Sequence, residues 1–147
     1  MSSNKITFRK DNLDMYLKEV SKEYRKISEK QMPAEIILVG GAAILANYGF
    51  RNMTTDMETI IQASSAMKEA INRVGDKYNL PSGWINNDFI KTESYSNKLR
   101  EVSKHYKTFA NIVDIRTVSG EHLIAMKLVS SRKYKNDLSD IVGILKE

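Results

Sequence analysis

The sequence predicts an α+β (α/β) protein in which a mixed β-sheet is flanked by helices. An apolar stripe with helical spacing runs from residue 13 to residue 27, and a short, continuous apolar run at 35–39 is typical of a buried strand. Further strand and helix patterns alternate after that run, without an internal repeat or a linker. Since 147 residues form one compact core, we expect a single domain over 1–147.

The first half of the chain gives the clearest elements. The stripe of the first helix consists of Leu13, Tyr16, Leu17, Val20, Tyr24 and Ile27, with Asp11 or Asn12 placed to cap it. The strand at 35–39 is closed by Gly40-Gly41, from which a short helix over 42–48 starts directly. A second strand is predicted over 56–61, and Ser64 or Ser65 caps a third helix that extends to Tyr78.

The second half is less regular. Residues 84–90 read either as a loop or as a short turn of helix, with Trp84 in core or loop packing. Residues 95–106 have helical character but little apolar pattern. Alternating β-branched residues predict a strand over 109–118, preceded by a hairpin turn. Ser119 then caps one helix and Asp137 begins another, so we expect a helical C-terminus.

Composition excludes several kinds of chemistry. The chain has no cysteine and two histidines, His105 and His122, which excludes disulfides, thiolate nucleophiles and cysteine-ligated metals. The longest apolar stretches, 36–39 and 42–46, are far shorter than the roughly 20 residues of a membrane span. The charged N-terminal segment also differs from a signal peptide. We therefore expect a cytoplasmic protein that has no membrane partner.

Positive charge is concentrated in one segment. The whole chain carries 23 Lys and Arg against 18 Asp and Glu, whereas residues 98–135 alone carry nine basic residues against three acidic ones. Such a concentration favours polyanions such as nucleic acid. The alternative is an ordinary solvated basic surface.

Two short motifs carry the candidate chemistry. Glycines at a strand-to-helix junction let the backbone approach a ligand, and the amides of a helix N-terminus favour a phosphate, although Gly40-Gly41 could equally be a tight turn. Asp56 and Glu58 are two positions apart, so in a strand they project to one face. Two adjacent carboxylates repel each other unless a cation lies between them, and oxygen ligands suit Mg²⁺ or Mn²⁺. Two exposed acids at a strand edge are the alternative.

The stretch LVGGAAILANYGFRNMTTDMET resembles the signature of the nucleotidyltransferase superfamily with the DNA polymerase β type of catalytic core. That signature is a strand, a glycine pair, a short helix, and two acids on the next strand. The version here is most similar to a small bacterial branch that includes uncharacterised nucleotidyltransferases and toxins of abortive-infection toxin–antitoxin systems. The C-terminal stretch HLIAMKLVSSRKYKNDLSDIVGIL also resembles this branch. Together the two motifs cover roughly residues 34–62 and 112–146.

The resemblance implies a nucleotidyltransferase-like core and assigns roles to residues. Its metal-binding and catalytic acids are Asp56, Glu58 and Asp114, with Mg²⁺ (or Mn²⁺) as cofactor. Glu58 departs from the aspartate usual in this branch. Asp114 could instead form a structural salt bridge with Arg116 or Lys127. The residues implied in nucleotide binding are Gly40, Gly41, Arg51, Thr55, Lys127 and Arg132.

We therefore expect a nucleotidyltransferase that transfers a nucleoside monophosphate from an NTP to an acceptor hydroxyl. The expected partners are the NTP, an RNA acceptor (tRNA by resemblance) ahead of a protein, and a cognate antitoxin protein. The alternative is a catalytically inactive nucleotidyltransferase-like module that binds RNA, a nucleotide or a partner protein.

Overall fold

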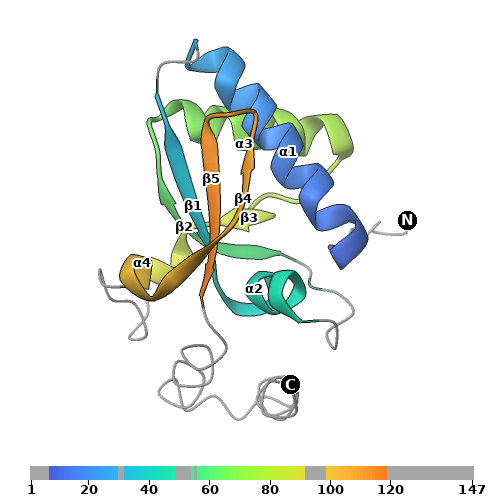
Figure 1. Cartoon of the computed structure of the whole chain (residues 1–147). Helices are drawn as coiled ribbons and strands as arrows, with labels where there is room; N and C mark the ends of the chain where they lie inside the picture. Colours follow the sequence, from blue (N-terminus) through green and yellow to red (C-terminus); the bar gives the residue numbers. More distant parts are fainter. Residues whose placement is uncertain (1–6, 30–31, 49–53, 55, 92–98, 119–147) are drawn as a thin grey trace, which may run out of the picture.

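A computed structural model describes residues 7–29, 32–48, 54, 56–91 and 99–118, which form a five-stranded sheet with helices packed around it (Figure 1). The strands are β1 (Ala34–Leu38), β2 (Met57–Gln62), β3 (Ile85–Asn86), β4 (Ser103–Phe109) and β5 (Val113–Val118). The helices are α1 (Lys10–Ile27), α2 (Gly40–Asn47), α3 (Ala66–Tyr78) and the short α4 (Leu99–Val102), with a 3₁₀ turn, η1, at Asp88–Lys91.

The sheet is mixed, which confirms the predicted fold class. Its strand order is β3-β2-β1-β5-β4. The central strand β1 runs antiparallel to β2 and parallel to β5, β2 is parallel to β3, and β4 is antiparallel to β5. Because β1 and β2 are antiparallel neighbours, the C-terminal end of β1 lies beside the N-terminal start of β2.

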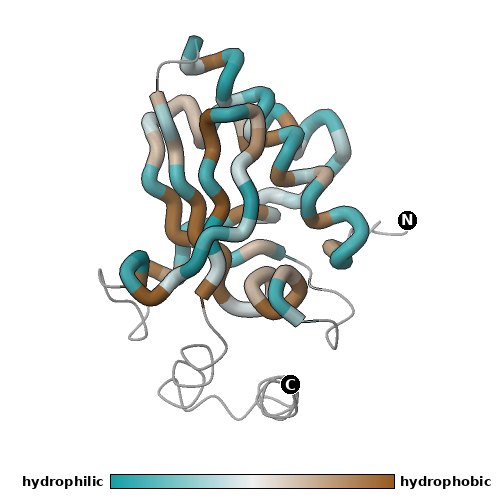
Figure 2. Tube along the Cα trace, viewed as in Figure 1, coloured by the Kyte–Doolittle hydropathy of each residue, from teal (hydrophilic) through white to brown (hydrophobic). Residues whose placement is uncertain are grey.

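The two faces of the sheet differ in polarity. Ile36, Leu38, Val113 and Ile115 share one face by register and are fully buried. Helices α1 and α3 pack together against the sheet, and Figure 2 shows that both helices contain a mixture of hydrophilic and hydrophobic residues. The opposite face carries Glu35, Asp114 and Arg116, all of them partly exposed. Polar chemistry is therefore concentrated on the second face and at the ends of the strands.

Trp84 packs in the core beside the edge strand β3, which is one of the two positions that the sequence left open. Its indole is 2% exposed and packs against Phe8 and Tyr16, and its Nε1 donates to the carbonyl of Ile71 at 3.3 Å. A Cβ on Gly75 of α3 would lie 3.0 Å from the same Nε1. The missing side chain at residue 75 thus lets the indole dock on the helix. The Trp84 carbonyl then accepts from Met57 N at 2.8 Å, which places β3 beside β2.

The predictions for 95–118 need correction. Residues 103–106 belong to β4 and not to a helix, and Phe109 ends β4, so the hairpin turn follows Phe109. Sequence pattern failed because β4 is an edge strand whose side chains at 104, 105, 107 and 108 are exposed. An edge strand with polar residues on both faces shows no apolar alternation.

Element ends differ from prediction by a few residues. Helix α1 begins at Lys10, so Asp11 and Asn12 lie within its first turn, where Asn12 Oδ1 accepts from the backbone N–H of Arg9 at 2.7 Å. Ser65 precedes α3 without a side-chain cap hydrogen bond. The helices predicted after Ser119 and Asp137 lie outside the described residues. Among the helices that are described, none has the length and apolar character to cross a membrane.

Candidate functional site

The glycine pair and the acidic motif lie side by side where β1 ends and β2 begins. The N–H of Val39, just after β1, donates to the carbonyl of Glu58 in β2 at 3.0 Å. Gly40 begins α2 with a φ of +57°, a left-handed conformation that favours glycine. A Cβ at residue 40 would lie 2.2 Å from Glu58 Oε2, so the Glu58 carboxylate occupies the space that any other residue would fill.

This contact gives Gly40 a specific role. The glycine permits a close approach, as the sequence suggested, and the group that approaches is the carboxylate of Glu58. That carboxylate therefore lies at the N-terminus of α2, where backbone N–H groups and the helix dipole stabilise negative charge. The longer glutamate side chain reaches the helix end from β2 because residue 40 has no side chain.

Asp56 lies immediately before β2, and a neutral amide contacts it. Asn86 Nδ2 donates to Asp56 Oδ2 at 3.3 Å, and Asn86 is also the register partner of Glu58 in the parallel β2–β3 pair. Asp56, Glu58 and Asn86 are all partly exposed. The start of β2 thus gathers two carboxylates, one amide and the N-terminus of α2.

Asp114 lies elsewhere on the sheet. It pairs in register with Glu35 of β1, whereas Glu58 faces Val39, four positions further along β1. At roughly 3.3 Å per residue, four positions separate the two acids by about 13 Å along the strand direction alone. The β5 residue closest in register to Glu58 is Val118, which is buried and apolar.

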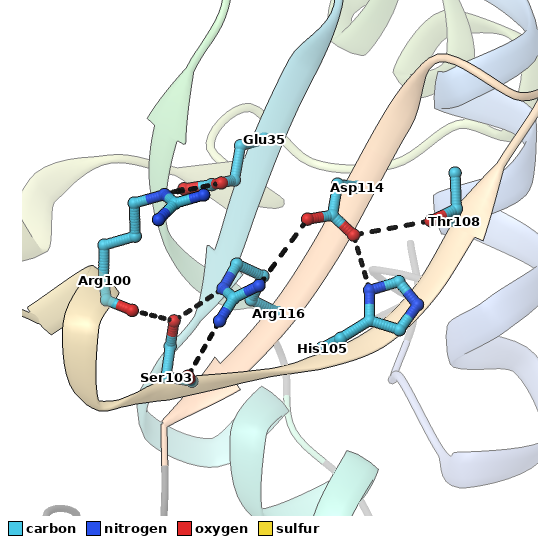
Figure 3. A network of polar contacts seen from close by, with 7 residues as sticks. All are labelled: Glu35, Arg100, Ser103, His105, Thr108, Asp114 and Arg116. Atoms are coloured by element: carbon cyan, nitrogen blue, oxygen red, sulfur yellow. Dashed lines mark hydrogen bonds and ion pairs between the residues drawn. The ribbon is translucent and has the colours of Figure 1, made fainter.

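The partners of Asp114 form a network between strands, which Figure 3 shows. Asp114 Oδ1 lies 2.6 Å from His105 Nδ1 and 3.4 Å from Thr108 Oγ1, and its Oδ2 is 3.8 Å from Arg116 Nη1. Arg116 also donates to the hydroxyl and the carbonyl of Ser103 at 2.7 and 2.8 Å. Asp114 thus forms the ion pair with Arg116 that one of its two interpretations expected, and the network ties the polar edge strand β4 to β5.

The structure therefore brings Asp56 and Glu58 together and leaves Asp114 apart from them. Within the described ranges, no group of three or more His, Asp or Glu side chains is close enough to hold a metal ion. Arg51, Thr55, Lys127 and Arg132 lie outside the described residues, as does the alternative Asp114–Lys127 pair. Asn86 was not anticipated, because only the β2–β3 pairing brings it to Asp56, 30 residues earlier in the chain.

The basic segment is partly neutralised where the structure describes it. Arg100 Nε donates to both carboxylate oxygens of Glu35 at 3.0 and 2.9 Å, next to the Ser103 end of the network (Figure 3). Lys107 pairs with Asp14 of α1, whose carboxylate also accepts from the hydroxyl of Tyr106 at 2.7 Å. Burial and this carboxylate raise the pKa of Tyr106 above its usual range. Lys104 and His105 are exposed on β4.

A hollow of about 910 Å³ lies between α3 and the segment leading to η1. Its polar lining includes Asn72, Asp76, Asn86, Asn87 and Asp88. The volume lies in the range of small-molecule pockets. Asn86 thus belongs both to this hollow and to the surroundings of Asp56.

Comparison with known proteins identifies a family. A family model described as "Nucleotidyltransferase of unknown function (DUF6036)" matches residues 15–144, which is most of the chain. No curated protein matches the sequence, and no solved structure matches it. The matched range includes the glycine pair, both acids at the start of β2, and Asn86.

Proposed function

Because the chain belongs to this family of nucleotidyltransferases, we propose that it transfers a nucleoside monophosphate from an NTP to an acceptor hydroxyl in a Mg²⁺-dependent reaction. One observation carries the proposal: the Glu58 carboxylate lies against Gly40 at the N-terminus of α2, with Asp56 two residues before it. Anion-binding amides and cation-binding oxygens thus adjoin each other, as a metal–triphosphate complex requires.

The residues at this edge fit Mg²⁺. The donor set consists of the carboxylate oxygens of Asp56 and Glu58, with no sulfur in the chain apart from methionine. Mg²⁺ commonly binds through one or two protein carboxylates and completes its shell with water and substrate phosphates. Two acids are therefore sufficient for a site that the nucleotide itself completes. When bound, the metal would stabilise charge on the triphosphate and acidify the attacking hydroxyl.

The chain's own groups then act by binding and orientation. The acceptor hydroxyl oxygen bonds to the α-phosphorus, the bond from that phosphorus to the bridging oxygen breaks, and pyrophosphate leaves while the hydroxyl proton passes to solvent. Asp56 and Glu58 hold the cation, and amides at the start of α2 face the phosphates. Arg51, Thr55, Lys127 and Arg132 belong to the proposal as further nucleotide contacts, through the resemblance of their motifs.

The acceptor that we propose is RNA, with tRNA favoured by resemblance over a protein. Lys104 on the edge strand supplies an exposed positive group on the surface that a polyanion would follow. A core of the DNA polymerase β type, a toxin role and a cognate antitoxin partner rest on the sequence resemblance.

The test is single-turnover transfer from an NTP labelled at the α-phosphate to cell RNA or protein. We expect Asp56→Ala to slow transfer by roughly a thousandfold, which corresponds to about 4 kcal/mol of lost transition-state stabilisation. Asp88→Asn is the control, because Asp88 carries an exposed carboxylate close in space to Asn86 that pairs with Lys91. Full activity in Asp56→Ala would refute the assignment.

A second function is supported by the position of Asp114. Since the described residues supply no third acid beside Asp56 and Glu58, the fold could serve as an inactive binding module. Mg²⁺-dependent NTP binding that disappears in Asp56→Asn supports the enzyme. RNA binding that is independent of metal and sensitive to salt supports the module.

A further inference from the structure

We propose that Asn86 is a positioning residue for the cation site, holding the Asp56 carboxylate in its metal-binding orientation. This inference rests on the proposed function, because it presupposes that Asp56 and Glu58 bind a divalent cation. The contact that suggests it is the hydrogen bond from Asn86 Nδ2 to Asp56 Oδ2, at 3.3 Å.

Two independent neighbours fix which way the Asn86 amide faces. Its Nδ2 donates to the carbonyl of Gly83 at 3.2 Å, and its Oδ1 accepts from the backbone N–H of Asp88 at 3.3 Å. A carbonyl requires a donor and an N–H requires an acceptor, so a flipped amide would lose both bonds. The amide therefore presents an N–H, and not its oxygen, to Asp56.

The backbone of Asn86 is held as well. Its carbonyl accepts from the hydroxyl of the fully buried Thr59 at 2.7 Å, and the residue pairs with Glu58 in the β2–β3 ladder. Because both the backbone and the amide are constrained, the N–H that reaches Asp56 is preorganised and costs little entropy to orient.

The chemistry of this donor suits a metal ligand. A neutral amide directs one carboxylate oxygen without neutralising its charge, whereas an arginine or lysine would compete with the cation. Hydrogen bonds to metal-binding carboxylates orient them, and losing such a partner typically weakens metal affinity by about 10- to 100-fold. Asp56 thus keeps its full charge and its remaining lone pairs for the cation.

The experiment measures Mn²⁺ binding to the full chain by electron paramagnetic resonance, together with thermal unfolding. We expect Asn86→Ala to weaken Mn²⁺ binding by about tenfold. The matched control is Asn87→Ala, since Asn87 Oδ1 accepts from the N–H of Ile61 at 3.2 Å, a comparable bond at the next residue. Asn87→Ala should lower the unfolding temperature similarly and leave Mn²⁺ affinity unchanged. Equal Mn²⁺ affinity in both variants and the wild type would overturn the inference.

A second variant tests the inference even if Asn86→Ala does not fold. Asn86→Asp has the same shape and keeps the acceptor for the Asp88 N–H, but it replaces the donor with negative charge. In this variant the added charge strengthens Mn²⁺ binding and the lost donor weakens it, so the informative readout is transfer, which we expect to be slower because Asp56 loses its donor. Transfer as fast as in the wild type would overturn the inference.

The proposed function and this inference fail in different ways. If Asp56→Asn leaves Mn²⁺ binding intact, the cation does not bind at Asp56 and the proposed function is overturned. If Asp56→Asn abolishes Mn²⁺ binding while Asn86→Ala binds Mn²⁺ as the wild type does, the proposed function stands and the role of Asn86 is overturned.

Discussion

Two acidic regions of the sheet differ in the partners that surround them. At the start of β2, Asp56 accepts from a neutral amide and Glu58 lies against a glycine and a helix end. At the start of β5, Asp114 contacts His105 and Arg116, both of which can carry positive charge. The described partner of Asp56 is thus a neutral amide, whereas Asp114 contacts groups of opposite charge. We therefore expect the charge of Asp56 to be available to a ligand and the charge of Asp114 to contribute to stability.

The largest expected effect tests this contrast directly. Asp56→Asn should reduce transfer by roughly a thousandfold and change stability little, because it removes a ligand charge and keeps the shape. Asp114→Asn should do the opposite, lowering the free energy of unfolding by about 1 kcal/mol through its hydrogen bonds, with transfer within a few-fold of wild type. Urea unfolding and single-turnover transfer measure both quantities. A thousandfold loss of transfer in Asp114→Asn would show that Asp114 belongs to the active site.

A second prediction concerns Gly40. We expect Gly40→Ala to cost about 1–2 kcal/mol in stability, because alanine is strained at positive φ. It should also displace the Glu58 carboxylate and weaken Mg²⁺-dependent NTP binding. Gly83→Ala is the control for strain, since Gly83 has a φ of +80° and an added Cβ there would meet no other atom within 4 Å. If both variants lose the same stability and Gly40→Ala still binds NTP normally, the contact with Glu58 has no functional role.

A third prediction addresses the acceptor. Neutralising Lys98, Arg100, Lys104 and Lys107 together should weaken RNA binding and reduce its salt dependence by about one counterion for each phosphate that these side chains neutralise. NTP affinity should be nearly unchanged. Because Arg100 and Lys107 also pair with Glu35 and Asp14, the variant should be somewhat less stable as well. Binding of RNA at several salt concentrations measures the slope.

The control for the third prediction neutralises four exposed lysines of α1, namely Lys10, Lys18, Lys22 and Lys26. The net charge change is then the same at another surface. An equal fall of the salt slope in the two quadruple variants would show that total charge, and not the edge strand, attracts RNA.

The smallest expected effect lies away from both acidic regions. A hydrogen bond from the Tyr78 hydroxyl (2.8 Å), followed by Lys77, lowers the pKa of Glu19 below its ordinary value of 4.5. A lowered folded-state pKa stabilises the fold above the unfolded pKa, and this contribution is lost as pH falls through the folded pKa. Glu19→Gln should therefore unfold at a lower temperature near neutral pH. The difference in unfolding temperature between Glu19→Gln and the wild type should vanish in acid. A difference that is independent of pH would contradict a lowered pKa of Glu19 in the folded protein.

The sequence predicted those features that depend on local pattern. The apolar stripe of α1, the buried run of β1 and the glycine pair all follow from spacing and residue type, and the structure has them. The position of Asp114 depends on strand register, which is set by pairing with β1 and leaves no trace in the residues around it. Asn86 belongs to a two-residue strand whose place depends on Trp84, so its contact with Asp56 could not be inferred from spacing.

The packing of Gly75 against Trp84 has a consequence for protein engineering. Replacing a glycine within a helix by alanine is a common way to stabilise a protein, with a gain of roughly 0.5–1 kcal/mol from helix propensity. In α3 the added methyl group would press on the indole nitrogen at 3.0 Å. Any shift of the indole would pass along the chain from Trp84 to Asn86 in β3, two residues later. A substitution chosen for thermostability, on the far side of a buried ring, would thus alter the geometry around Asp56.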